Sequence, residues 1–221
     1  MSSENGLDRL LAVRSAATVN QPQGIRREGP LGDIIRRNAS WVSTMTTGHV
    51  FMAMSLDGFV ARSDGSVDWL MKQKVEGENH GFDAFMASVD GMVMGRASYQ
   101  NVLTFGDWPY KKTVVVMSRT LTDVDIPDEL KGRVRLSNLT PRELMEQLDN
   151  EGWKRAYVDG GKIVQSFLSA GLIKDIELTH IPILIGDGIQ LFGRLKEDID
   201  LEHIETRSFP SGLVTSKYKI C

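Results

Sequence analysis

The chain has 221 residues, and its 26 basic and 29 acidic side chains give a net charge of −3, which argues against a dedicated nucleic-acid-binding protein. Hydrophobic residues make up 41% of the chain, and no apolar run approaches the roughly 20 residues that cross a bilayer. The single cysteine, Cys221, excludes an internal disulfide, so we expect a globular protein of a reducing compartment, the cytoplasm, with no membrane or nucleic-acid partner.

Residues 1–44 differ in composition from the rest of the chain. They hold six arginines and no lysine, and outside a short stretch around Leu10 no period organises their apolar residues. Such a segment buries too little apolar surface to offset the entropy of ordering it. We therefore predict a disordered, dispensable extension over residues 1–44 and one domain over residues 45–221. An organelle transit peptide is the alternative, against which the four acidic residues of the segment count.

From Gly48 onward, short apolar runs alternate with amphipathic segments. Buried strands are predicted at residues 49–54, 91–94, 113–117, 156–158 and 176–181, and an alternating strand at residues 212–220. Helices are predicted over residues 80–90 and from residues 98, 140 and 160. The third helix starts with a capping box of Thr140 and Glu143, and Gly171 ends the fourth. This alternation indicates an α/β sheet with helices on both faces and an antiparallel C-terminal strand.

Several common cofactor and metal motifs are missing. No G-x-G-x-x-G is present. Around Gly161-Lys162, Ala156 stands where a P-loop has its first glycine, and Ile163 stands where it has the Ser or Thr that would bind Mg²⁺. Neither the H-E-x-x-H motif nor the G-x-S-x-G motif occurs. The four histidines show no i, i+4 pairing, so no metal site is expected.

Three predicted strand ends carry residues suited to a phosphate-bearing ligand. They are Gly95-Arg96-Ala97-Ser98, Met117-Ser118-Arg119 and Asp159-Gly160-Gly161-Lys162. Glycine allows close approach of the backbone, a helix N-terminus attracts anions, and a cation adds charge. Each segment is also compatible with an ordinary turn and a solvated cation. Because ligands of open α/β sheets bind at the carboxyl ends of the strands, we expect the three segments to form one dinucleotide site.

The same segments carry a family resemblance. The order Ala53-Met-Ser-Leu-Asp-Gly58, Gly-Arg-Ala-Ser-Tyr99, Val-Val-Val-Met-Ser-Arg119, Val-Asp-Gly-Gly-Lys162 and Leu-Thr-His-Ile181 resembles the dihydrofolate reductase-like superfamily over residues 48–220. More closely, it is similar to the branch related to the C-terminal reductase domain of the riboflavin-biosynthesis deaminase–reductase. The resemblance implies a mixed, mostly parallel eight-stranded sheet, a homodimer and an NADPH-dependent reductase.

The resemblance also implies roles for individual residues. The cofactor-binding set, from the nicotinamide through the phosphates to the adenosine end, would be Ala53, Val60, Gly95, Arg96, Ala97, Ser98, Gly160, Gly161, Lys162, Ile163, Ser118 and Arg119. The substrate-facing set would be Phe51, Asp57, Trp69 and Thr179. The acidic residue that dihydrofolate reductases carry on their first helix has no clean counterpart, since Asp83 stands too close to Gly95. The expected substrate is therefore a pteridine-like or ribosylaminopyrimidine-like heterocycle rather than folate itself.

The implied reaction is hydride transfer to an electrophilic carbon, with the hard chemistry carried by the cofactor. Asp57 or ordered water would donate the accompanying proton, although Asp-Gly is also a favoured turn dipeptide. Trp69 would stack on a flat heterocycle, or it is a core tryptophan. Two other classes stay open: a catalytically inactive NADPH-binding regulatory protein, and an interaction domain whose basic N-terminal segment binds an acidic surface. Cofactor oxidation with a panel of substrates distinguishes the enzyme from both.

Overall fold

The computed structural model describes residues 45–73 and 77–221, so the extension predicted over residues 1–44 lies outside the described residues. The strands are β1 (Thr47–Ser55), β2 (Phe59–Ala61), β3 (Gly91–Gly95), β4 (Val114–Met117), β5 (Val134–Ser137), β6 (Arg155–Asp159), β7 (Ile173–Ile181), β8 (Ile189–Gln190), β9 (Leu201–Ser208) and β10 (Val214–Ile220). The helices are α3 (Phe82–Ser88), α4 (Arg96–Leu103), α5 (Pro141–Asn150) and α6 (Gly161–Ser169), with single-turn 3₁₀ helices η1 (Asp123–Asp125) and η2 (Asp128–Leu130). In these described residues, no helix is long and apolar enough to cross a membrane.

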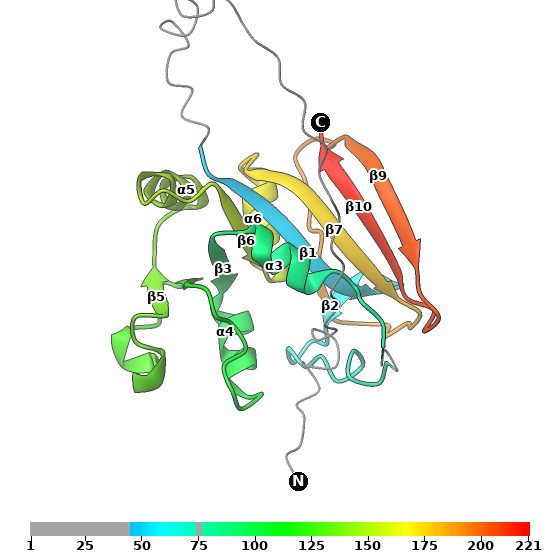
Figure 1. Ribbon diagram of the computed structural model, residues 1–221, viewed down its shortest axis with the longest axis horizontal. Coiled ribbons are helices and arrows are strands. Elements are labelled where there is room, and N and C mark those ends of the chain that lie inside the picture. The colour runs from blue at the N-terminus through cyan, green and yellow to red at the C-terminus, as the bar shows by residue number, and fades with distance from the viewer. Residues whose placement is uncertain (1–44, 74–76) are drawn as a thin grey trace, which may run out of the picture.

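Eight of the strands form one sheet in the order β5-β4-β3-β6-β1-β7-β10-β9 (Figure 1). The central strand β1 runs parallel to β6 and β7, and the parallel pairing continues through β3 and β4 to β5. Within this sheet β10 runs antiparallel to both of its neighbours, β7 and β9. The predicted mixed, mostly parallel eight-stranded sheet with an antiparallel C-terminal strand is confirmed. A separate ribbon pairs β2 with β8.

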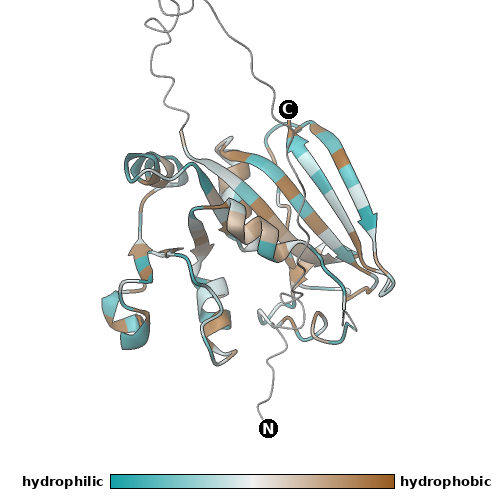
Figure 2. Ribbon diagram, viewed as in Figure 1, coloured by the Kyte–Doolittle hydropathy of each residue, from teal (hydrophilic) through white to brown (hydrophobic). Residues whose placement is uncertain are grey.

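The central strands bury both of their faces, as their continuous apolar runs predict. Val93 and Val115 enter one core together with α5 and α6. Met92 and Val114, one position earlier on the same strands, enter a second core with α3 and α4. Figure 2 shows hydrophobic segments along β1 and β7 and more hydrophilic stretches on β9 and β10. Helices therefore cover both faces of the sheet, as predicted.

Two strands of the sheet, β5 and β9, were not predicted from the sequence. In the four-residue strand β5 only Val134 is buried. In β9 every residue except the half-buried Arg207 is exposed. Both strands lie at the edges of the sheet, where a strand need not bury a face, so neither has the apolar pattern that identifies the inner strands.

Candidate functional site

Two helices begin side by side at the carboxyl edge of the sheet (Figure 1). β3 and β6 are parallel neighbours with Met94 opposite Asp159, and α4 and α6 each begin two residues later. A Cβ atom added at Gly160, just before α6, would lie 2.5 Å from Ser98 Oγ in the first turn of α4. The first and third predicted segments are therefore in direct contact.

Neither of these helix N-termini is capped by a side chain. The N-cap residues are Gly95 and Gly160, and no side chain accepts a hydrogen bond at either cap. A helix N-terminus carries about half a positive elementary charge, and its free N–H groups are ready donors to an anion. The paired N-termini of α4 and α6 thus offer two adjacent sets of donors, which suits a pyrophosphate.

Three exposed cations flank this pair of helix N-termini: Arg96, Lys162 and, after β4, Arg119. Arg96 Nη1 donates a hydrogen bond to Thr120 Oγ1 at 2.8 Å. Within the described residues, none of the three cations has an acidic partner. Their charge is therefore available to a ligand.

The end of β4 lies beside the end of β3, with Met117 opposite Gly95. The side chain of Ser118 is occupied by its own turn, because its Oγ accepts hydrogen bonds from the backbone N–H groups of Thr120 at 3.1 Å and Leu121 at 3.0 Å. All three predicted segments thus share one edge, as expected from the strand order, and Ser118 shapes the turn that presents Arg119.

The glycine pair at the start of α6, Gly160 and Gly161, is explained largely by contacts within the protein. Gly160 has φ 93°, a left-handed conformation that favours glycine. A Cβ atom at Gly161 would lie 2.8 Å from the carbonyl oxygen of Gln190 on β8 and 3.4 Å from Cγ2 of Val60 on β2. The β2–β8 ribbon, and not open space for a ligand, occupies that side of Gly161. Val60 is thereby placed beside the N-terminus of α6.

Trp69 is a core residue, which corrects the expectation that it stacks on the substrate. Its side chain is fully buried in a cluster with Ile181 and Leu213, against which Ala53 packs. A ring without exposed surface cannot contact a ligand in this conformation. The sequence left this reading open because a tryptophan that follows a turn is compatible with a core or a binding site.

The other predicted substrate residues are also engaged within the protein. Thr179 is 6% exposed, and its Oγ1 lies 2.8 Å from Oγ1 of Thr215 on β10. Phe51 is half-buried, with its ring centroid 5.0 Å from that of Phe85 on α3. Of Phe51, Trp69 and Thr179, Phe51 is the one whose side chain is partly exposed, and it packs beside α3.

Asp57 holds a loop in place, so the structure does not support the predicted role as proton donor. Its Oδ2 accepts hydrogen bonds from the backbone N–H groups of Gly186 at 2.8 Å and Ile185 at 3.0 Å. A hydrogen bond from Ser55, followed by these backbone bonds, lowers the pKa of Asp57 below its ordinary value. A carboxyl group with a lowered pKa is ionised near neutral pH and has no proton to give.

Asp159 has a raised pKa, which a proton donor needs and Asp57 lacks. The sequence prediction did not include Asp159 in the site. It ends β6 immediately before the glycine pair and is half-buried. Burial raises the pKa of Asp159, and this effect exceeds the opposing hydrogen bonds from Tyr157, Ser98 and the Gly160 N–H. The available signal was an acidic residue directly after the buried run at residues 156–158.

A tyrosine and a backbone carbonyl complete this cluster. Tyr157 Oη lies 2.8 Å from the carbonyl oxygen of Phe51 and 3.2 Å from Oδ1 of Asp159. Burial, and secondarily the charge of Asp159, raises the pKa of Tyr110. Asp159 is thus surrounded by hydroxyl groups from β6, α4 and the segment before β4. No group of three or more His, Cys, Asp or Glu side chains in the described part of the chain is arranged to hold a metal ion.

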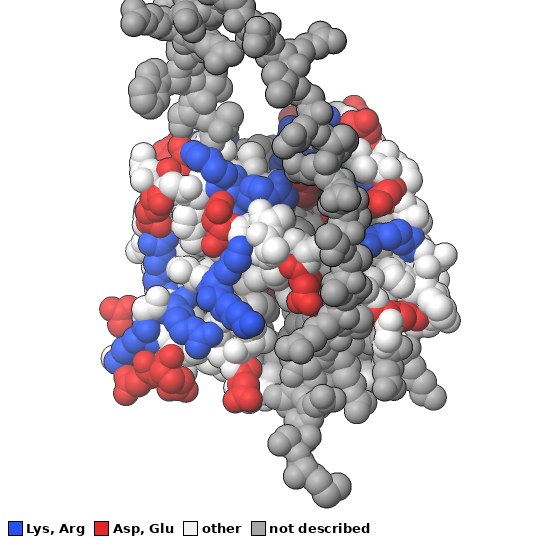
Figure 3. Space-filling view, in the orientation of Figure 1, with Lys and Arg blue, Asp and Glu red and all other residues white. Residues whose placement is uncertain are grey.

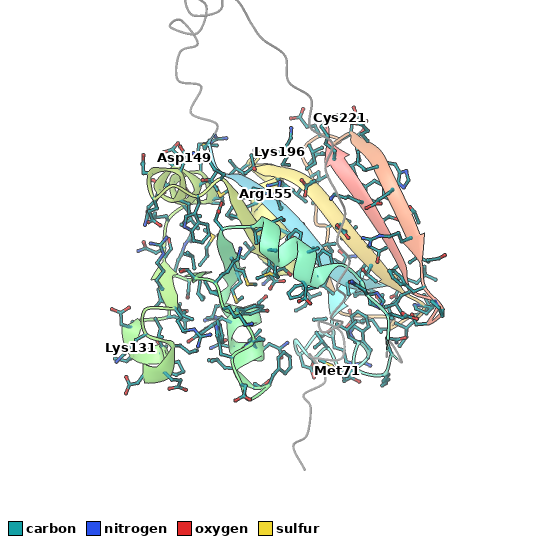
Figure 4. The ribbon with its side chains drawn as sticks, viewed as in Figure 1. Met71, Lys131, Asp149, Arg155, Lys196 and Cys221 are labelled. Carbon is teal, nitrogen blue, oxygen red and sulfur yellow. The ribbon has the colours of Figure 1, made fainter. Side chains whose placement is uncertain are left out.

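The charged side chains outside the cluster are spread over the surface. Figure 3 shows Lys and Arg side chains mainly on the half of this face that carries α4, α5 and β5. Arg155, labelled in Figure 4, begins β6 at the opposite end of the strand from Asp159. Four residues of extended chain separate the two residues by about 13 Å, so Arg155 is too far away to neutralise Asp159.

Comparison with known proteins identifies relatives for most of the chain. The profile of the RibD C-terminal domain matches residues 46–215. The crystal structure of a putative riboflavin biosynthesis protein from Shewanella sp. PV-4 is 35% identical, has a TM-score of 0.75, and the match covers 80% of this chain and 99% of that chain.

Two more distant structures share the fold. One is the diaminohydroxyphosphoribosylaminopyrimidine deaminase/5-amino-6-(5-phosphoribosylamino)uracil reductase from Thermotoga maritima, with 12% identity, a TM-score of 0.63, and coverage of 80% of this chain and 57% of that chain. The other is dihydrofolate reductase from Enterococcus faecalis complexed with NADP(H), with 14% identity, a TM-score of 0.55, and coverage of 79% and 96%. The predicted dihydrofolate reductase-like fold is confirmed.

Proposed function

This chain belongs to the RibD C-terminal domain family, a reductase-like enzyme family, and from that membership we propose that it is an NADPH-dependent reductase. Its substrate would be a pteridine-like or ribosylaminopyrimidine-like heterocycle. The observation that carries the proposal is the pair of uncapped helix N-termini of α4 and α6, with three exposed cations beside them.

These residues fit the anionic parts of a dinucleotide. The N–H groups that follow Gly95 and Gly160 would hold the pyrophosphate, and Lys162 would add a charge beside it. Arg96 and Arg119 flank one turn and would bind a 2′-phosphate, since a guanidinium pairs with phosphate bidentately. Val60, beside α6, and Ala53, near the carboxyl end of β1, would lie toward the nicotinamide. When bound, the cofactor supplies the hydride.

The protein would supply orientation and a proton. Reduction of a C=N or C=O bond requires a proton at the heteroatom, and a general acid works best when its pKa lies near the operating pH. Asp159 has a raised pKa and lies beside the glycine pair, whereas the pKa of Asp57 is lowered. We therefore assign the role of proton donor to Asp159, and we expect Phe51 to face the substrate from the α3 side of the sheet.

The experiment is a titration of the full chain with NADPH, followed by assays of NADPH oxidation with a panel of pteridines and ribosylaminopyrimidines. We expect saturable binding and oxidation that depends on one class of heterocycle. Lys196→Ala is a matched control, because Lys196 is an exposed lysine far from the carboxyl edge of the sheet (Figure 4). Binding without turnover would indicate the inactive regulatory protein instead, and absence of binding would overturn the cofactor site.

A further inference from the structure

Tyr110 is a buried side chain whose hydroxyl group has no hydrogen-bond partner in the part of the chain that the structure describes. The residue is 8% exposed, and Arg133 Nη2 donates to its backbone carbonyl oxygen at 2.6 Å. Burial and the charge of Asp159 act on the phenol, but no hydrogen bond does. The hydroxyl oxygen is not among the polar atoms that are sealed from solvent without a partner, so it still touches solvent-accessible space.

The hydroxyl groups of the other buried tyrosines, Tyr99 and Tyr157, are bonded within the protein. Tyr99 Oη donates to the carbonyl oxygen of Asp125 at 3.2 Å, and Tyr157 Oη donates to the carbonyl oxygen of Phe51 at 2.8 Å. Buried polar groups are normally hydrogen-bonded, because an unmade bond leaves the cost of their desolvation uncompensated. Phenylalanine would fill the place of Tyr110 equally well, so its hydroxyl has no use in the packing.

The phenol of Tyr110 belongs to the cluster around Asp159. The charge of Asp159 acts on Tyr110, and Tyr110 acts in turn on Tyr157, whose hydroxyl donates to Asp159 Oδ1 at 3.2 Å. Tyr110 and Tyr157 share one apolar core with α3 and α4, and Phe51 packs against it. This is the side from which Phe51 is expected to face the heterocycle, so an unbonded hydroxyl stands at the proposed substrate site.

Neighbouring groups fix the position of Tyr110. The Trp108 ring packs edge-on against it, with ring centroids 5.4 Å apart and an angle of 83° between the planes. Trp108 also packs against Tyr99 of α4, with centroids 6.0 Å apart, and Pro109 restricts the backbone between Trp108 and Tyr110. With Arg133 bonded to its backbone, Tyr110 is held in place before a ligand binds, which lowers the entropy that binding costs.

Among the described hydroxyl and N–H groups around Asp159, the proton of Tyr110 is the one that no protein acceptor takes. The Tyr157 and Ser98 hydroxyls and the Gly160 N–H all bond to Asp159. Burial, and secondarily the charge of Asp159, raises the pKa of Tyr110, so its phenol keeps its proton near neutral pH. The cluster thus offers one free donor, which needs an acceptor from a ligand.

We propose that Tyr110 is a substrate-binding residue, and that its hydroxyl donates a hydrogen bond to a carbonyl oxygen on the ring of the heterocycle. The inference rests on the proposed function and narrows its substrate class to heterocycles with a ring carbonyl, such as pterins and aminouracils. An amino group in the place of that carbonyl would turn its own hydrogens toward the phenol proton, and the carboxyl group of Asp159 would attract it instead. Tyr110 therefore selects a ring carbonyl over an amino group.

The test measures the binding of matched pairs of probes to the full chain in excess NADP⁺. Pterin and aminouracil carry the ring carbonyl, and diaminopteridine and aminocytosine have an amino group in its place. We expect each carbonyl probe to bind about 3- to 10-fold more tightly than its amino analogue, the equivalent of one neutral hydrogen bond. Tyr110→Phe should remove this preference by weakening the carbonyl probes alone. No preference in the unmodified chain, no binding of either carbonyl probe, or a preference that survives Tyr110→Phe would overturn the proposal.

Tyr99→Phe is the matched control, because it also removes a buried tyrosine hydroxyl, but one that bonds the protein. It should lower the melting temperature by about 2–4 °C, the shift that one lost hydrogen bond produces in a chain of this size, and leave the probe preference intact. Tyr110→Phe should leave the melting temperature unchanged. A fall as large as that of Tyr99→Phe would show that the Tyr110 hydroxyl has a structural partner, which also overturns the proposal.

The cofactor site and the role of Tyr110 can fail separately. A chain that binds no NADPH but prefers carbonyl probes through Tyr110 would refute the proposed function and leave the assignment of Tyr110 standing. A chain that binds and oxidises NADPH but shows no such preference would refute the assignment of Tyr110 alone.

Discussion

Removal of the Arg96 guanidinium tests the phosphate site most directly. Arg96 donates to Thr120, the residue after Arg119, so the two guanidinium groups flank a single turn at the end of β4. NADPH differs from NADH by the 2′-phosphate, and a hydrogen bond to a charged group contributes about 1.5–3 kcal/mol, or roughly 10- to 150-fold in affinity. Because Arg96 is exposed, solvent screening places the effect near the lower end, at about tenfold.

The assay is a set of dissociation constants for NADPH and NADH with the unmodified chain, Arg96→Ala, Arg119→Ala and the control Lys196→Ala. We expect NADPH to bind about tenfold more tightly than NADH. Either arginine variant should weaken NADPH and leave NADH almost unchanged, and the preference should shrink as salt screens the charges. Equal affinities in the unmodified chain, or equal losses for the two dinucleotides, would refute the placement of the 2′-phosphate.

Three further outcomes are expected. Gly161→Val should lower the melting temperature more than Gly161→Ala, because a Cβ atom at this position already lies 2.8 Å from the carbonyl oxygen of Gln190. A variant that melts normally but fails to bind NADPH would show instead that a ligand requires the glycine. Asp57→Asn should lower the free energy of unfolding near neutral pH. Because the pKa of Asp57 is lowered in the folded chain, the ionised side chain stabilises the fold above its unfolded pKa of about 3.9, and this stabilisation is lost as the pH falls through the folded pKa. The urea unfolding curves of the variant and the unmodified chain should therefore converge in acid, and a gap that stays constant with pH would contradict this. A chain that starts at Met45 should fold and bind NADPH like the full chain, and precipitation or a melting temperature several degrees lower would show that residues 1–44 contribute to stability.

The sequence determined the inner strands and the helix starts that follow them. Strands that bury both faces need apolar residues at every position, so Val93, Val115 and their neighbours identify β3 and β4 without further information. The turn glycines then place α4 and α6 at one edge of a parallel sheet. This much follows from local chemistry and the common direction of the strands.

The chemical state of the site residues was decided by tertiary structure. Asp57 and Asp159 each precede a glycine, yet hydrogen bonds from Ser55 and from the loop at Gly186 lower the pKa of Asp57, whereas burial raises the pKa of Asp159. Trp69 became a core residue for the same reason, through contacts with β7 and the β9–β10 turn. Burial and hydrogen-bond partners come from segments far apart in the chain, so the pattern around a residue gives its place on an element but not its solvation or its proton.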